Sequence, residues 1–161
     1  MEDVACAIEF MKSAHAGQLD KAGQPYWQHP LAVMNRLGPD ATEDERIVAL
    51  LHDVIEDTDW TPSELIGEGF APEVVAAVEL LSRPTGPTRP TYMDWIRSIA
   101  ASGNRAAIRV KIADNEENSA PDRVATLPEG ERDIVRRYER SLAILRPALA
   151  RLPVDIPSTP A

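Results

Sequence analysis

The chain has 161 residues, 43% of them apolar, and carries a formal net charge of −9. This length and apolar content fit one domain with a hydrophobic core, which we expect to span residues 1–152, ahead of a flexible tail at 153–161. The acidic balance argues against nucleic acid or an anionic membrane as a partner, because both bind basic surfaces.

The single cysteine, Cys6, excludes an internal disulfide. No stretch resembles a secretory signal or an apolar run of about 18 residues that could span a bilayer. We therefore expect a cytoplasmic protein. The sequence leaves its oligomeric state open.

Apolar residues recur at helical spacing from one end of the chain to the other. Val4, Ile8 and Met11 fall on one helical face, as do Tyr138 and Leu142, and no segment alternates as a strand would. The proline-rich stretch "RPTGPTRP" at 83–90 predicts a linker. The pattern predicts a single-domain, all-α fold of seven or eight helices, at 3–16, 29–37, 43–58, 62–68, 72–82, 92–102, 104–118 and 129–151.

Helix start signals agree with these positions. "TEDE" at 42–45, "TPSE" at 61–64 and "TYMD" at 91–94 each place a threonine three residues before an acid, which is a capping box or a close variant. Pro62 suits the first turn of the second of these helices.

The segment "LLHDVIEDTD" at 50–59 is unusually acidic. If 43–58 is one continuous helix, then His52, Asp53, Glu56 and Asp57 form a polar wedge and apolar residues cover the rest of its surface. A solvated helix face is the ordinary explanation, but such faces mix charges, because like charges one turn apart repel. Between residues 47 and 82 there are eight acids and no lysine or arginine. A bound divalent cation would turn this repulsion into coordination, and carboxylates beside imidazole suit Mn²⁺, Fe²⁺ or Zn²⁺.

Further ligands must come from other segments. His29 in "PYWQHP" stands at the edge of a helix, whereas His15 lies on an apolar stripe and is more typical of packing or capping. Asp114 in "VKIADNEEN" shares a helical stripe with Lys111 and Asn118. A buried aspartate needs a partner, and a structural ion pair with Lys111 is the alternative to a metal.

Together, "AHAGQLDKAGQPYWQHP", "ALLHDVIEDT" and "VKIADNEEN" resemble the HD-domain hydrolases of the RelA/SpoT type, above all the small stand-alone alarmone hydrolases. The resemblance runs from about residue 4 to residue 150. It implies a helical HD domain around one Mn²⁺ ion. The ligands implied by it are His29, His52, Asp53 and Asp114.

The resemblance also implies roles for other residues. Glu56 and Asp57 match the acids around the attacking water, and we favour Glu56 as the acid nearest that water, although the two roles are interchangeable. Asn118 matches an asparagine near the metal and nucleotide. Tyr138 matches a tyrosine near the nucleoside, with a core aromatic as the alternative. The basic residues available to a polyphosphate are Arg83, Arg89, Arg109, Lys111, Arg136 and Arg137.

The activity implied by the resemblance is removal of the 3′-pyrophosphate from (p)ppGpp, the alarmone of the stringent response. The family's arginine that stacks on guanine corresponds to Asp20 here, followed by Lys21, which can meet a phosphate. An adenine alarmone such as (p)ppApp is therefore a plausible substrate. The alternatives are an HD-type phosphatase for another nucleotide or a phosphate monoester, and a metal-binding regulatory module without turnover.

Overall fold

Helices make up the molecule in the computed structural model, which describes residues 3–153. The described residues contain no strand, only an isolated bridge between Leu19 and Pro25. The helices are α1 (Val4–Ala14), α2 (Gln28–Arg36), α3 (Glu43–Leu51), α4 (Val54–Asp57), α5 (Pro62–Gly67), α6 (Pro72–Leu81), α7 (Tyr92–Ala101), α8 (Arg105–Asn118), α9 (Pro121–Ala125) and α10 (Ile134–Arg151), with a 3-10 helix η1 (Glu129–Glu131) before α10. The all-α prediction is confirmed.

The start signals act as expected. Thr42 and Glu45 exchange hydrogen bonds between side chain and backbone at the start of α3, and Thr61 and Glu64 do the same at the start of α5. Thr91 accepts from the backbone N–H of Asp94 at 3.1 Å and so caps α7. These bonds satisfy amide groups that have no partner within the helix.

The continuous helix expected over 43–58 is wrong. α3 ends at Leu51, and α4 begins at Val54. His52 Nδ1 lies 2.6 Å from the carbonyl oxygen of Ala49, the group that the Asp53 N–H would bond in an unbroken helix. Asp53 adopts φ −104° and ψ −2°, which departs from the values of about −63° and −42° in a regular α-helix. The ring of His52 thus interrupts the helix where the HD pair stands.

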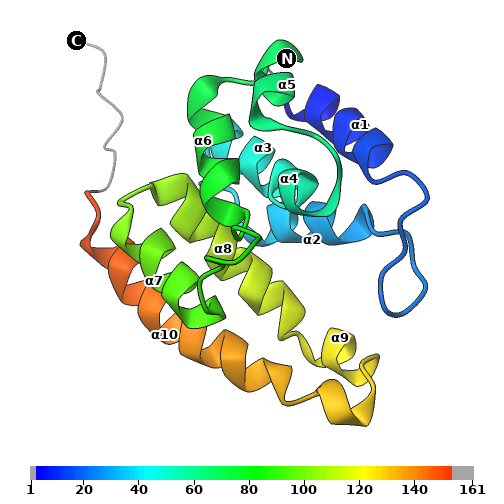
Figure 1. The fold of residues 1–161 in the computed structure, drawn as a ribbon, viewed down its shortest axis with the longest axis vertical. Coiled ribbons are helices and arrows are strands. Elements are labelled where there is room, and N and C mark those ends of the chain that lie inside the picture. Colours follow the sequence, from blue (N-terminus) through cyan, green and yellow to red (C-terminus); the bar gives the residue numbers. More distant parts are fainter. Residues whose placement is uncertain (1–2, 154–161) are drawn as a thin grey trace.

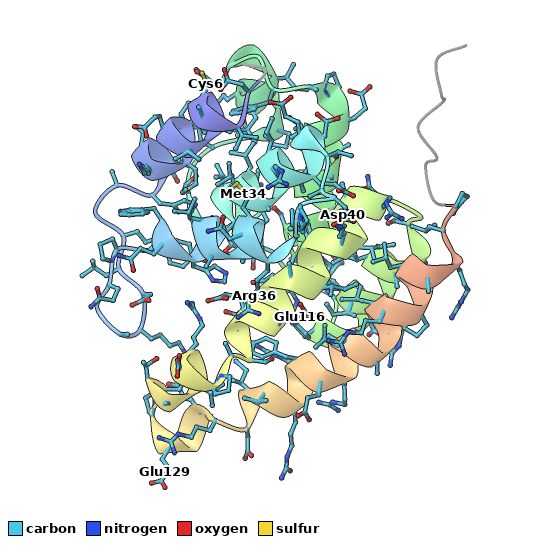
Figure 2. The ribbon with its side chains drawn as sticks, turned by 180° about the vertical axis from the view of Figure 1, so that it is seen from behind. Cys6, Met34, Arg36, Asp40, Glu116 and Glu129 are labelled. Carbon is cyan, nitrogen blue, oxygen red and sulfur yellow. The ribbon has the colours of Figure 1, made fainter. Side chains whose placement is uncertain are left out.

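α8 forms the centre of the fold. It packs against α2, α3, α6, α7 and α10 and runs diagonally through the middle of the molecule (Figure 1). On its buried surface, apolar residues such as Ile108 and Val110 are followed by three buried polar residues, Lys111, Asp114 and Asn115. Figure 2 shows the molecule from behind and labels Arg36 of α2, which forms an ion pair with Glu117 of α8 where these two helices pack together.

The remaining differences from the predicted elements concern the C-terminal part. The helix expected at 129–151 is divided into η1 and α10, and α9 was not predicted. The tail expected at 153–161 lies outside the described residues except for Pro153 and stays a prediction. Among the helices at 3–153, none combines the length and apolar character required to cross a bilayer.

Candidate metal centre

Two histidines and an aspartate meet inside the molecule. His29 lies in the first turn of α2, and His52 and Asp53 form the junction of α3 and α4. One potential ligand atom from each of these three residues lies within 4.8 Å of the other two. Asp114 of α8 borders the same space, since its Oδ1 lies 3.1 Å from His29 Nε2 and 3.7 Å from His52 Nε2. The four side chains come from three separate parts of the chain.

The orientation of His52 leaves a lone pair facing this space. Its Nδ1 must donate to the Ala49 carbonyl, because a carbonyl oxygen can only accept, so Nε2 of the neutral ring has no proton. Nε2 is buried without a hydrogen-bond partner, 3.0 Å from Asp53 Oδ2 and 3.7 Å from Asp114 Oδ1. Three electron-rich atoms therefore face one another. A divalent cation would satisfy all three, and the mixture of imidazole and carboxylate suits such an ion.

A proton on His52 competes with a cation for the space between His52, Asp53 and Asp114. Burial lowers the pKa of His52, but the carboxylates of Asp53 and Asp114 outweigh burial and raise it well above its ordinary value. Burial conversely raises the pKa of Asp53, and the neighbouring His52 outweighs this and lowers it. A cation entering the site replaces the proton on His52 and meets carboxylates that are already ionised.

Surrounding residues fix both carboxylates. The Tyr26 hydroxyl donates to Asp53 Oδ2. Lys111 Nζ donates to Asp114 Oδ2 at 2.8 Å, and Asn118 Nδ2 donates to Asp114 Oδ1 at 2.8 Å. The Lys111 ion pair and the position beside the histidines were alternatives for Asp114, and the structure has both, one on each oxygen. Hydrogen bonds of this kind orient metal-binding carboxylates in proteins.

Glu56 and Asp57 lie on α4 directly after the HD pair. Glu56 Oε2 accepts from the backbone N–H of Arg83 at 3.1 Å, and Glu56 lines the cavity that contains His29 and Asp53. Asp57 lines a different hollow, beside Glu64, which Glu56 also borders. Partial burial raises the pKa of both acids. Of the two, Glu56 is therefore the one that borders the cavity of the metal centre.

Two cavities meet at this position. The one that we call the inner cavity, about 340 Å³, includes His29, Asp53, Glu56, Lys111 and Asp114. A second one, the outer cavity, about 290 Å³, is lined by Lys21 and by apolar residues such as Leu127 and Ile134. Tyr26, Asn118, Arg123 and Tyr138 line both. The predicted substrate residues are thus divided, with Lys111 in the inner cavity, Lys21 in the outer cavity, and Asn118 and Tyr138 at the boundary.

Asp20, which lines the outer cavity, stabilises a turn of the backbone. Its Oδ1 accepts from the backbone N–H groups of Ala22 and Gln24, both at 2.9 Å, and so closes the turn 20–24. Gly23 allows this turn with φ 78°. The adjacent Lys21 forms an ion pair with Glu131 of η1. At the position expected for a stacking arginine, this chain therefore has a turn-forming carboxylate.

Several functional predictions need correction. Arg109 does not line the inner cavity but is bound to Glu45 and Asp40, and Arg136 is exposed outside it. Arg123 lines both cavities and was missed. Tyr92, which also lines the inner cavity, was missed because an aromatic residue on an apolar stripe is usually part of the core. Tyr26 lines it too and lies in the turn before α2; its place three residues before His29, within the segment that carries the family resemblance, could have indicated it.

The chain is similar in sequence to several larger proteins. The "Guanosine-3′,5′-bis(diphosphate) 3′-pyrophosphohydrolase" of Aquifex aeolicus is 44% identical over 79 residues, which are 48% of this chain and 11% of that protein. The Haemophilus influenzae protein of the same name is 34% identical over 113 residues, 66% of this chain and 17% of that one. A "Probable GTP pyrophosphokinase" of Mycobacterium leprae is 46% identical over 71 residues, covering 42% of this chain and 9% of the relative. The chain thus spans less than a fifth of the length of these relatives.

A solved structure has the same fold. It is described as a metazoan ortholog of SpoT that hydrolyzes ppGpp, and it matches 92% of both chains with a TM-score of 0.71 and 21% sequence identity. The family model described as "HD domain" matches residues 7–113. This range includes His29, His52 and Asp53 and ends within α8, one residue before Asp114. HD domains hold a divalent metal, and the His29, His52 and Asp53 cluster is a possible site for it. This chain therefore belongs to the HD domain family.

Proposed function

We propose that this protein is a Mn²⁺-dependent nucleotide phosphohydrolase that removes the 3′-pyrophosphate from (p)ppGpp-like alarmones, with (p)ppApp as a further candidate. The observation that carries the proposal is the unpartnered Nε2 of His52, which faces two carboxylates beside a cavity lined with arginines. The first feature supports a cation, and the second supports a phosphorylated ligand. The relatives named 3′-pyrophosphohydrolases support the choice of substrate.

Within this proposal, His29, His52, Asp53 and Asp114 hold one Mn²⁺ ion. A bound divalent ion acidifies a water molecule and polarises a phosphoryl oxygen. Lys111 holds Asp114 through its second oxygen, and Tyr26 holds Asp53, so that both carboxylates present a fixed face to the site. The support for this ligand set is the convergence of buried donor atoms described above.

Glu56 is proposed as the general base. Its raised pKa makes it a better proton acceptor than a glutamate of ordinary pKa, and the Arg83 N–H fixes one of its oxygens. Glu56 takes a proton from water as the water oxygen bonds to the phosphorus attached to the 3′ oxygen. The bond between that phosphorus and the 3′ oxygen breaks, and the 3′ oxygen leaves as a hydroxyl after taking up a proton. Asp57 is proposed to orient the water.

The nucleoside is proposed to occupy the outer cavity. Its apolar lining, from Leu127 and Ile134, suits a base, and Tyr138 and Asn118 stand at the boundary where a ribose would connect base and phosphates. Because Asp20 supports a turn and offers no cationic plane, selection of guanine by stacking is not built into this position. We therefore propose (p)ppApp as a substrate in addition to (p)ppGpp.

The test is a hydrolysis screen of purified protein with Mn²⁺ on ppGpp, ppApp, NADPH and nucleoside monophosphates. The proposal expects pyrophosphate from ppGpp or ppApp and none after the metal is chelated. Free phosphate from NADPH or a monophosphate alone would instead identify a monoester phosphatase. Metal binding without any product would identify a regulatory module.

A further inference from the structure

The inner cavity contains more positive charge than its acids require. The chain as a whole has a net charge of −9, yet five basic side chains line this one cavity together with three acids. The acids are Asp53, Glu56 and Asp114. The basic residues are Arg83, Arg89, Lys111, Arg123 and Arg137.

The side chains of four of these five basic residues form no ion pair with a carboxylate among residues 3–153. Lys111 is paired with Asp114. The Arg83 guanidinium donates two hydrogen bonds to the carbonyl oxygen of Pro90, which is uncharged. No ion pair is formed within the described part of the chain by Arg89, Arg123 or Arg137, in contrast to exposed arginines such as Arg97. Arginines gathered without counterions repel one another, and a polyanionic ligand removes that repulsion.

Arg137 differs from the other arginines because the protein holds it in position without neutralising it. Its guanidinium carbon lies 4.2 Å from the centre of the Tyr92 ring and 5.7 Å from that of Tyr138. Its Nε is buried and has no hydrogen-bond partner. The Tyr92 hydroxyl donates to Asn115 Oδ1 at 3.3 Å, which ties the supporting ring to α8. Cation–π packing fixes the plane of a guanidinium and leaves its N–H groups available to an anion.

Tyr92 also connects Arg137 with the metal centre. Lys111 Nζ lies 5.9 Å from the centre of the same ring and 2.8 Å from Asp114 Oδ2. Arg83 lies on this ring as well, 5.9 Å from its centre. One aromatic ring thus gathers three cations, of which Lys111 touches a residue of the metal centre and Arg137 has no acid beside it.

We propose that Arg137 binds the outer phosphoryl group of the 3′-diphosphate and so makes the site select diphosphates over monophosphates. This inference rests on the proposed function. A monophosphate ester has no outer phosphoryl group and gains nothing from Arg137. A diphosphate places additional negative charge in the cavity, where a planar guanidinium can bind two of its oxygens. The residue determines specificity and takes no part in proton transfer.

The substitution Arg137→Gln tests this proposal, with Arg136→Gln as the matched control. Arg136 is one position earlier on α10, is exposed and lies outside the cavity, so the control makes the same change of charge on the same helix. We expect Arg137→Gln to raise KM for a nucleoside 3′-diphosphate at least about tenfold with kcat much less affected, because a charge-assisted hydrogen bond is lost. The ratio of kcat/KM for the 3′-diphosphate to that for the 3′-monophosphate falls in parallel, and Arg137→Lys recovers part of it. An unchanged ratio in Arg137→Gln contradicts the proposal.

A binding measurement separates this inference from the proposed function. Inorganic pyrophosphate is titrated into the Mn²⁺-loaded protein by calorimetry, which requires no turnover. The inference expects wild type and Arg136→Gln to bind equally well and Arg137→Gln to bind at least about tenfold more weakly. If that pattern is found while no alarmone is hydrolysed, the proposed function fails and the diphosphate site stands. If all three proteins bind alike while alarmones are hydrolysed, the activity stands and the role of Arg137 is wrong.

Discussion

Two buried charged clusters connect α8 to α2 and α3, and they differ in whether their charges are matched. The first joins Arg109 of α8 to Glu45 of α3, whose side chain is 5% exposed. Arg109 also donates to the Leu37 carbonyl at 2.8 Å and lies 2.7 Å from Asp40. Each strong donor there has an acceptor within the protein. The second cluster, around His52, leaves Nε2 of that ring buried without a hydrogen-bond partner, facing Asp53 and Asp114.

This difference indicates which of the two clusters serves the fold and which serves a ligand. A cluster whose hydrogen-bond donors and acceptors are all paired within the protein can hold two helices together without binding a ligand. A cluster that leaves buried acceptors facing one another costs stability unless a ligand completes it. We therefore propose that the Arg109 cluster stabilises the fold and that the His52 cluster binds a metal, and substitutions in the two clusters should have different effects.

The largest effect is expected from Asp53→Asn. It removes a charge from the unmatched cluster but preserves the shape of the side chain, so we expect metal content to fall far below one ion per chain and hydrolysis to fall to background. Metal analysis and steady-state kinetics measure this. The matched control is Asp59→Asn, which removes one charge from an exposed acid six residues later. Equal metal content in the two variants would contradict the assignment.

Glu56→Gln is expected to separate catalysis from metal binding. The amide oxygen can still accept from the Arg83 N–H but cannot take a proton from water. We expect kcat to fall by about 10²- to 10⁴-fold with the metal retained. The pH dependence of kcat/KM in the wild type should have an acidic limb above the ordinary pKa of glutamate, because burial raises the pKa of Glu56 and activity requires the ionised form. A wild-type rate in Glu56→Gln would remove it from the mechanism.

Arg109→Met should affect stability and leave the metal in place. It removes one of the two arginines beside the buried Glu45 carboxylate and leaves Arg105 Nε at 3.6 Å, so the loss of the charged hydrogen bond should cost about 1.5–3 kcal/mol in the free energy of unfolding. Arg97→Met, which breaks the exposed pair with Asp94, should cost less than about 1 kcal/mol. Denaturant unfolding measures both. Loss of metal affinity in Arg109→Met at temperatures where it is folded would make the two clusters one functional unit.

The smallest effect is expected at the outer cavity. Asp20→Asn retains an oxygen that can accept from Ala22 and Gln24, so it should preserve the turn and the ratio of guanine to adenine activity. Asp20→Arg supplies a cationic plane and should raise that ratio several-fold. Competition between ppGpp and ppApp measures the ratio. The same ratio in both variants would place Asp20 outside base recognition.

The fold was predictable where its signals are local. "TEDE" and "TPSE" specify helix starts through bonds that span three residues, and the structure contains those bonds. The break after Leu51 was not predictable, because it depends on the His52 ring taking the Ala49 carbonyl. α9, at Pro121–Ala125, is too short for a period of 3.6 residues to be recognised.

The candidate site was predictable where acidic residues had no basic residue near them in the sequence. His52 and Asp53 were indicated by acids without bases, and Asp114 by a buried position that required a partner. Tyr92 and Arg123 gave no such signal, since a tyrosine on an apolar stripe and an isolated arginine are ordinary in any helical protein. Their placement in the cavity follows from how α7 packs against α8 and α10 and how α9 packs against α8, which no local sequence pattern specifies.

Calorimetric titration of metal-free protein with Mn²⁺ tests whether the cluster around His52 binds a metal. We predict one ion per wild-type chain, unchanged binding in Arg109→Met and loss of binding in Asp53→Asn. Saturating Mn²⁺ should also raise the melting temperature of the wild type, because the ion binds the folded state. No binding by the wild type, or equal binding by Asp53→Asn, would contradict the claim that the unmatched cluster around His52 is a metal centre.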